Sequence, residues 1–159
     1  MLHWRANHRG EDDVRRDVEN ARAMLPILRL KLDKEGPAVA RLYGEGLVEV
    51  SRALAHALDV PTEQALSGSD LNLDQIAAAS RDLQAAEDRC REHLSGGTDA
   101  SRALAAQLIF GCKILARLYR LRRHALSAEG PARGEAESLA ASYADMSRVL
   151  SDIALQETV

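Results

Sequence analysis

Hydrophobic residues in this chain recur mostly at every third or fourth position, which is the spacing of one face of an α-helix. Five stretches with this spacing predict five amphipathic helices, over residues 11–34, 37–59, 71–94, 98–126 and 135–156. Residues with branched β-carbons are sparse and apolar and polar positions do not alternate, so no strand is predicted. We therefore predict an all-α fold, an antiparallel bundle of about five helices joined by short links.

The stretch 98–126 is the longest candidate helix and the most apolar. Between Leu104 and Leu121 its positions are apolar around most of the helix circumference, and its cationic residues fall on one narrow stripe. A helix that is apolar on several flanks needs neighbours on each of them. We predict that Thr98 caps this helix and that it is the most buried element of the bundle.

Glycine and proline positions predict the irregular parts of the fold. Pro26 lies inside the first helical stretch and predicts a kink or a break there. Gly44 and Gly46 lie inside the second and predict the close approach of another helix. A short helical turn is expected over residues 61–66, and Asp70 is expected to cap the third long helix.

A length of 159 residues suits one domain with a single core. We predict a flexible N-terminal tail over residues 1–10 and a single helical-bundle domain over residues 11–159. The first residues carry no apolar leader, and cations interrupt the apolar stretch 98–126 too often for a membrane span. We expect a cytoplasmic protein with no membrane partner.

Charge and aromatic content limit nucleic-acid binding to a local patch. The net charge is -3 and aromatic residues make up only 3% of the chain, so neither general attraction to polyanions nor base stacking is expected. The candidate patch is cationic and lies on the helix 98–126; its residues are Arg102, Lys113, Arg117, Arg120, Arg123 and His124. Such spaced cations could follow a phosphate backbone. Alternatively they face solvent, or pair with acids such as Glu87, Asp88 or Asp145.

One pair of residues in this patch resembles a catalytic motif. Arg117 and His124 are separated by six residues and resemble the R-x4-6-H pattern of HEPN-type ribonucleases, which are small helical bundles. The resemblance implies RNA cleavage by an Arg and a His at a dimer interface. It covers two residues only, and Leu118 stands where that family usually has a polar residue.

Two further resemblances fall in the second helical stretch. His56, Leu58 and Pro61 have the H-x-L-x-x-P spacing of the phosphoacceptor helix in sensor kinases. Residues 50–68 resemble the closing helices of Cro/repressor-type helix-turn-helix domains. A histidine near a helix end followed by a common helix-ending turn explains both patterns, and we favour this explanation over phosphotransfer and DNA reading.

Metal and catalytic motifs are sparse. Cys90 and His93 stand three residues apart and form half of a zinc site. In an antiparallel hairpin, however, Cys112 would lie about 15 Å further along the helix. We predict no metal, no cofactor and no catalytic residue; enzymatic activity is uncertain, and the balance is against it. The function expected is a non-enzymatic helical protein–protein interaction module, self-associating or a small subunit of a larger assembly.

Overall fold

A computed structural model describes the backbone of residues 2–156, together with the side chains of residue 10 and residues 12–156. Within this part the regular structure is helical throughout, which confirms the all-α prediction. The six helices are α1 (Leu2–Glu35), α2 (Pro37–Leu58), α3 (Thr62–Ser67), α4 (Leu73–Gly96), α5 (Asp99–Ser127) and α6 (Pro131–Leu155). The bundle therefore has six helices instead of five, because the turn after Pro61 forms the short helix α3.

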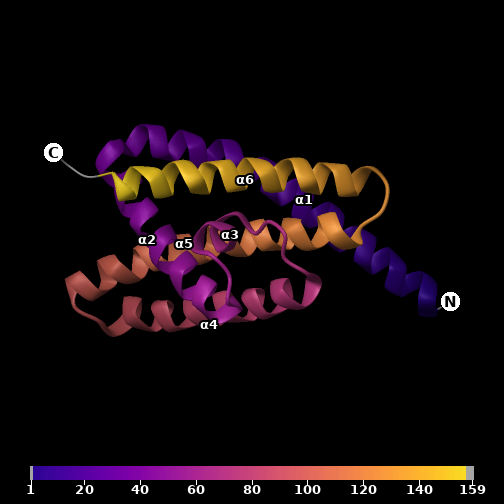
Figure 1. Cartoon of the computed structure of the whole chain (residues 1–159), viewed down its shortest axis with the longest axis horizontal. Helices are drawn as coiled ribbons and strands as arrows, with labels where there is room; N and C mark the ends of the chain where they lie inside the picture. Colours follow the sequence, from indigo (N-terminus) through magenta and orange to yellow (C-terminus); the bar gives the residue numbers. More distant parts are fainter. Residues whose placement is uncertain (1, 157–159) are drawn as a thin grey trace.

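Helix α5 lies at the centre of the bundle. Figure 1 shows α4 and α6 running antiparallel to it on two sides, with α2 crossing obliquely. Eleven of its residues are buried, more than in any other helix of the described chain, and they include His124 near its C-terminal end. The prediction that this helix is the most buried is confirmed. Thr98 caps it by accepting a hydrogen bond from the Ser101 amide, also as predicted.

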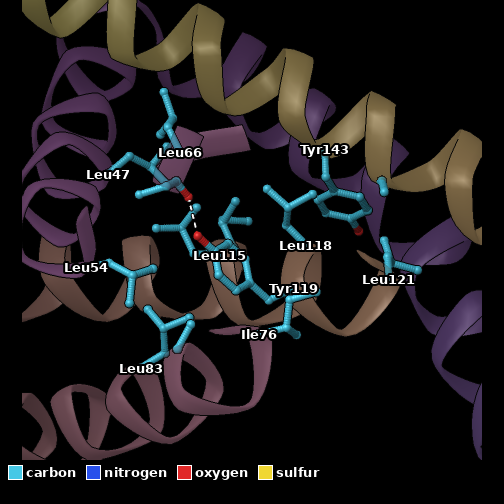
Figure 2. Close-up of a cluster of buried hydrophobic side chains, with 14 of the residues drawn as sticks. Leu47, Leu54, Leu66, Ile76, Leu83, Leu115, Leu118, Tyr119, Leu121 and Tyr143 are labelled. Carbon is cyan, nitrogen blue, oxygen red and sulfur yellow. Dashed lines mark hydrogen bonds between the residues drawn. The ribbon is translucent and has the colours of Figure 1, made fainter. Parts of the chain in front are cut away.

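The core fills the space around α5. Figure 2 shows leucines from α2, α3, α4 and α5 gathered there with two tyrosines. Tyr119 donates a hydrogen bond of 2.5 Å to the Ala65 carbonyl, and Tyr143 donates one of 2.8 Å to the Ala21 carbonyl. These bonds give the two buried tyrosine hydroxyls an acceptor. They also fix α3 and α1 against the centre of the bundle.

Helix α2 approaches its neighbours closely at its two glycines. A Cβ on Gly44 would collide with the Leu150 carbonyl of α6, and one on Gly46 with the Gln107 carbonyl of α5. Gly111 of α5 faces Gly46 at the same crossing. The prediction of close packing at these glycines is confirmed.

Two predicted boundaries were wrong. The first helix begins at Leu2 and not near Glu11, so the backbone of residues 2–10 is helical; Gly10 lowers helix stability by only about 1 kcal/mol and does not end the helix. The predicted flexibility of this segment is untested. The third long helix is capped by Asn72 in a capping box with Gln75, while Asp70 adopts a left-handed backbone. Helix α1 continues through Pro26, so of the predicted kink or break only the break is wrong.

Candidate functional site

The predicted cationic patch is divided between three places on α5. Arg102 is exposed in the first turns and forms an ion pair of 2.7 Å with Asp99. Lys113, Arg117 and Arg120 lie together further along, where they line a cavity of about 260 Å³ between α4 and α5. The other two members, Arg123 and His124, belong to a different cavity at the C-terminal end. Three of the six predicted residues therefore share a site.

His124 is the clearest departure from the predicted patch. Its side chain is only 4% exposed, and its Nε2 lies 2.7 Å from Oδ2 of Asp17 on α1. Helical spacing places His124 on the same side of α5 as Arg117, but α1 covers this end of the helix. His124 is thus a buried partner of Asp17 and is not part of a cationic surface.

The Arg117 and His124 pair of the HEPN resemblance does not share a cavity. Arg117 lines the space between α4 and α5. His124 lines a cavity of about 970 Å³ between α1, the end of α5 and the start of α6, which Arg123 also lines. Arg22 and Glu135 form an ion pair of 2.6 Å across this second cavity. The geometry brings no observation in favour of the ribonuclease alternative, which is untested.

The acids expected to neutralise the cationic patch have other partners. Glu87 accepts from Arg91 at 3.0 Å, and Asp145 pairs with Arg148 at 3.2 Å. Asp88 accepts a hydrogen bond of 3.0 Å from Gln84. Among the described side chains, none forms an ion pair with Lys113, Arg117 or Arg120. We call these three cations the α5 triad.

Arg117 is the half-buried member of the triad. Its guanidinium lies beside the Tyr143 phenol, where burial raises the pKa of Tyr143 and the Arg117 charge partly offsets that rise. Lys113 and Arg120 are exposed on either side of it along the helix.

The two cysteines line one cavity of about 480 Å³ between α2, α4 and α5. The predicted hairpin register separated them along the helices, yet both face this space. Burial raises the pKa of the Cys112 thiol to about 12, and it raises the pKa of the less buried Cys90 thiol as well. Among the residues whose side chains are described, no three potential ligands gather into a metal site.

Helix α1 has a second apolar face that sequence reasoning missed. Its inner face packs on the core through Val18, Ala21 and Leu25. On the opposite side lie four exposed apolar residues, which we call the outer stripe of α1: Ala23, Pro26, Ile27 and Leu30. The sequence contains this second face as another set of apolar residues with i, i+3, i+4, i+7 spacing. It lies on the opposite side of the helix from the core-facing set.

The exposure of the outer stripe is large for its residue types. Ile27 is 58% exposed and Leu30 is 56% exposed. Single exposed hydrophobic residues are common on protein surfaces, whereas neighbouring ones aligned along a helix are typical of contact surfaces. The outer stripe is thus an exposed apolar surface on α1, and the α5 triad is a cationic surface on α5.

No protein-family profile, curated protein or solved structure matches this chain. Within residues 2–156, none of the helices combines the length and the apolar character needed to cross a bilayer.

Proposed function

We propose that this protein is a non-enzymatic helical interaction module that pairs with a second copy of itself through the outer stripe of α1. The observation that carries the proposal is the presence of two opposite apolar faces on one helix. The inner face is covered by the rest of the bundle, while Ile27 and Leu30 of the outer face are more than half exposed. An apolar face gains free energy when a partner removes it from water.

The shape of the outer stripe suits another helix. Its four residues follow the i, i+3, i+4, i+7 spacing along about two turns, which is the pattern of helices that dock side by side. The small side chain of Ala23 leaves room for a larger side chain of a partner helix. Leu30 is large enough to fill the corresponding space on that partner. A helix with the same sequence, running in the opposite direction, meets both requirements.

The charges beside the stripe favour a second copy over an unrelated partner. Glu19 lies seven residues before Pro26, and Lys34 lies seven residues after Ile27. A two-fold axis through the Pro26–Ile27 bond therefore places Glu19 of each copy opposite Lys34 of the other. The same axis places Ala23 opposite Leu30, which gives the self-complementary contact that a symmetric dimer requires.

Glu19 and Lys34 are available for this pairing. Neither forms an ion pair with a described side chain of its own chain, although many other charged residues of the helices pair within one turn. Both are exposed on α1. Interface charges arranged in this way fix orientation and register more than they add affinity.

The experiment compares the solution mass of three proteins by sedimentation equilibrium over a range of concentrations. The wild type should approach twice its chain mass of 17.3 kDa. Ile27→Glu should remain monomeric, because it buries a charge in the contact. The control Leu104→Glu alters an equally exposed leucine on α5 and should still dimerise. A wild type that is monomeric throughout, or a loss of dimer in both variants, would overturn the proposal.

A further inference from the structure

The α5 triad gathers positive charge in a small concave space. Lys113, Arg117 and Arg120 line the cavity of about 260 Å³ together with Gln84 and Glu87 of α4. Glu87 is the one carboxylate of the lining, and its charge is already matched by Arg91 at 3.0 Å. The cavity is therefore lined by three cations, one neutral amide and one carboxylate that is paired with Arg91.

This arrangement lacks the ion pairs that many other described cations of the chain form. Like charges three or four residues apart on a helix repel one another, and Lys113, Arg117 and Arg120 have this spacing. Elsewhere an acid within one turn matches the cation, as Glu45 does for Arg41 and Glu137 for Arg133. Around the triad the positions one turn away are apolar or cationic. An anion bound in the cavity would remove this repulsion.

We propose that the groove between α4 and α5 binds phosphate groups through the α5 triad. A guanidinium donates two parallel hydrogen bonds to phosphate oxygens, and a lysine adds a compact positive charge. Arg117 is half-buried, so part of its side-chain freedom is already restricted before binding. Gln84 of the facing helix also lines the groove, where its amide donates to Asp88. The surface is separate from the outer stripe of α1, and the inference does not depend on self-association.

The phosphate could come from a small phosphorylated compound or from a nucleic-acid strand. The three Cα atoms of the triad extend over about 10 Å of helix, which is enough to contact neighbouring phosphates of one strand. Both sources use the same chemistry, since none of the triad residues reads a base. Two probes distinguish them: inorganic pyrophosphate and a short single-stranded oligonucleotide of mixed sequence.

The test compares the full-length wild type with the double variants Lys113→Gln/Arg120→Gln and Arg102→Gln/Arg123→Gln. Both variants lose two positive charges from exposed positions of α5, but only the first changes the groove. Titration calorimetry measures pyrophosphate binding, and fluorescence anisotropy measures oligonucleotide binding at low and physiological salt. Far-ultraviolet circular dichroism verifies that each variant is folded, and Arg120→Gln alone replaces the groove variant if it is not.

We expect the groove variant to lose about tenfold or more in affinity for at least one probe, and the control variant to remain within about twofold. Binding of pyrophosphate without the oligonucleotide identifies a small phosphorylated ligand. Steeply salt-dependent binding of the oligonucleotide identifies a nucleic-acid strand. Absence of binding to both probes, or an equal loss in the two variants, would overturn the proposal.

Discussion

His124 Nε2 lies 2.7 Å from Asp17 Oδ2, and this contact joins the C-terminal end of α5 to the first half of α1. The histidine is almost completely buried, whereas the aspartate is 21% exposed. Because the carboxylate accepts, Nε2 carries the proton. Removing the carboxylate would leave a buried N–H without a partner, and such a group is costly to keep from water.

Asp17→Ala should therefore destabilise the protein by about 1–3 kcal/mol. Urea unfolding followed by circular dichroism measures this free energy. The matched control is Asp12→Ala, which removes an exposed aspartate paired with Arg15 on the same helix and should cost at most about 1 kcal/mol. Equal losses in the two variants would show that the buried pair has no special role.

Gly46→Ala should destabilise the crossing of α2 and α5. The added Cβ would collide with the Gln107 backbone carbonyl, which cannot move without displacing α5. We expect a loss of about 1–3 kcal/mol or more, measured by the same urea unfolding. Gly134→Ala is the control: a Cβ there meets nothing within 4 Å, and alanine in place of glycine inside α6 should stabilise by up to about 1 kcal/mol.

Much of the fold followed from spacing, but several particulars did not. The 3.6-residue period located the long helices, and the close packing at Gly44 and Gly46 follows because glycine permits it. His124 is buried because α1 crosses the end of α5. The spacing of apolar residues within α5 does not show where α1 packs. Residues 2–10 lack a strong apolar pattern, so their helical backbone was missed.

The candidate surfaces were only partly predictable for the same reason. A helical wheel of α5 aligns Arg102 and His124 with the triad, but the neighbouring helices decide which positions remain in one cavity. The outer stripe of α1 was hidden by the stronger core-facing series. Whether this stripe is exposed depends on which side of α1 packs against the bundle. Only the packed structure shows which side that is.

Ser147→Ala should stabilise the protein. Ser147 is fully buried on α6, and its Oγ is the one buried side-chain oxygen or nitrogen among the described residues without a hydrogen-bond partner. Replacing it with a methyl group should raise the free energy of unfolding by about 1 kcal/mol. Thermal unfolding provides the measurement. In contrast, Ser51→Ala removes a buried hydroxyl that donates to the Val48 carbonyl, so it should not raise the free energy of unfolding.

The two thiols should differ in reactivity. Burial raises the pKa of Cys112 to about 12 from an ordinary value of 9.0, so this thiol is protonated at neutral pH and also shielded by the core. A maleimide or disulfide reagent should label Cys90 first and Cys112 only on unfolding. Mass spectrometry of the labelled protein shows which cysteine reacts first. Equal labelling rates for Cys90 and Cys112 in the folded protein would contradict the burial of Cys112.

The same shift in pKa gives a pH dependence of stability. Above pH about 9 the unfolded chain releases the Cys112 proton while the folded protein retains it, so stability should fall as the pH rises towards 12. The contribution is fully present below pH about 9. Cys112→Ala should reduce this alkaline decline, although it lowers stability at neutral pH by removing buried volume. A decline of the same size in wild type and variant would contradict the assignment.

In the proposed dimer the α1 helices of two copies pair antiparallel, with Glu19 of one copy opposite Lys34 of the other. The most direct test is a charge exchange followed by sedimentation equilibrium on Glu19→Lys, Lys34→Glu and the double variant. We predict that each single variant dimerises more weakly, because like charges then face each other, and that the double variant recovers the wild-type mass at the same concentration. A dimer that is equally stable in all four proteins, or a double variant weaker than both single ones, would contradict this arrangement.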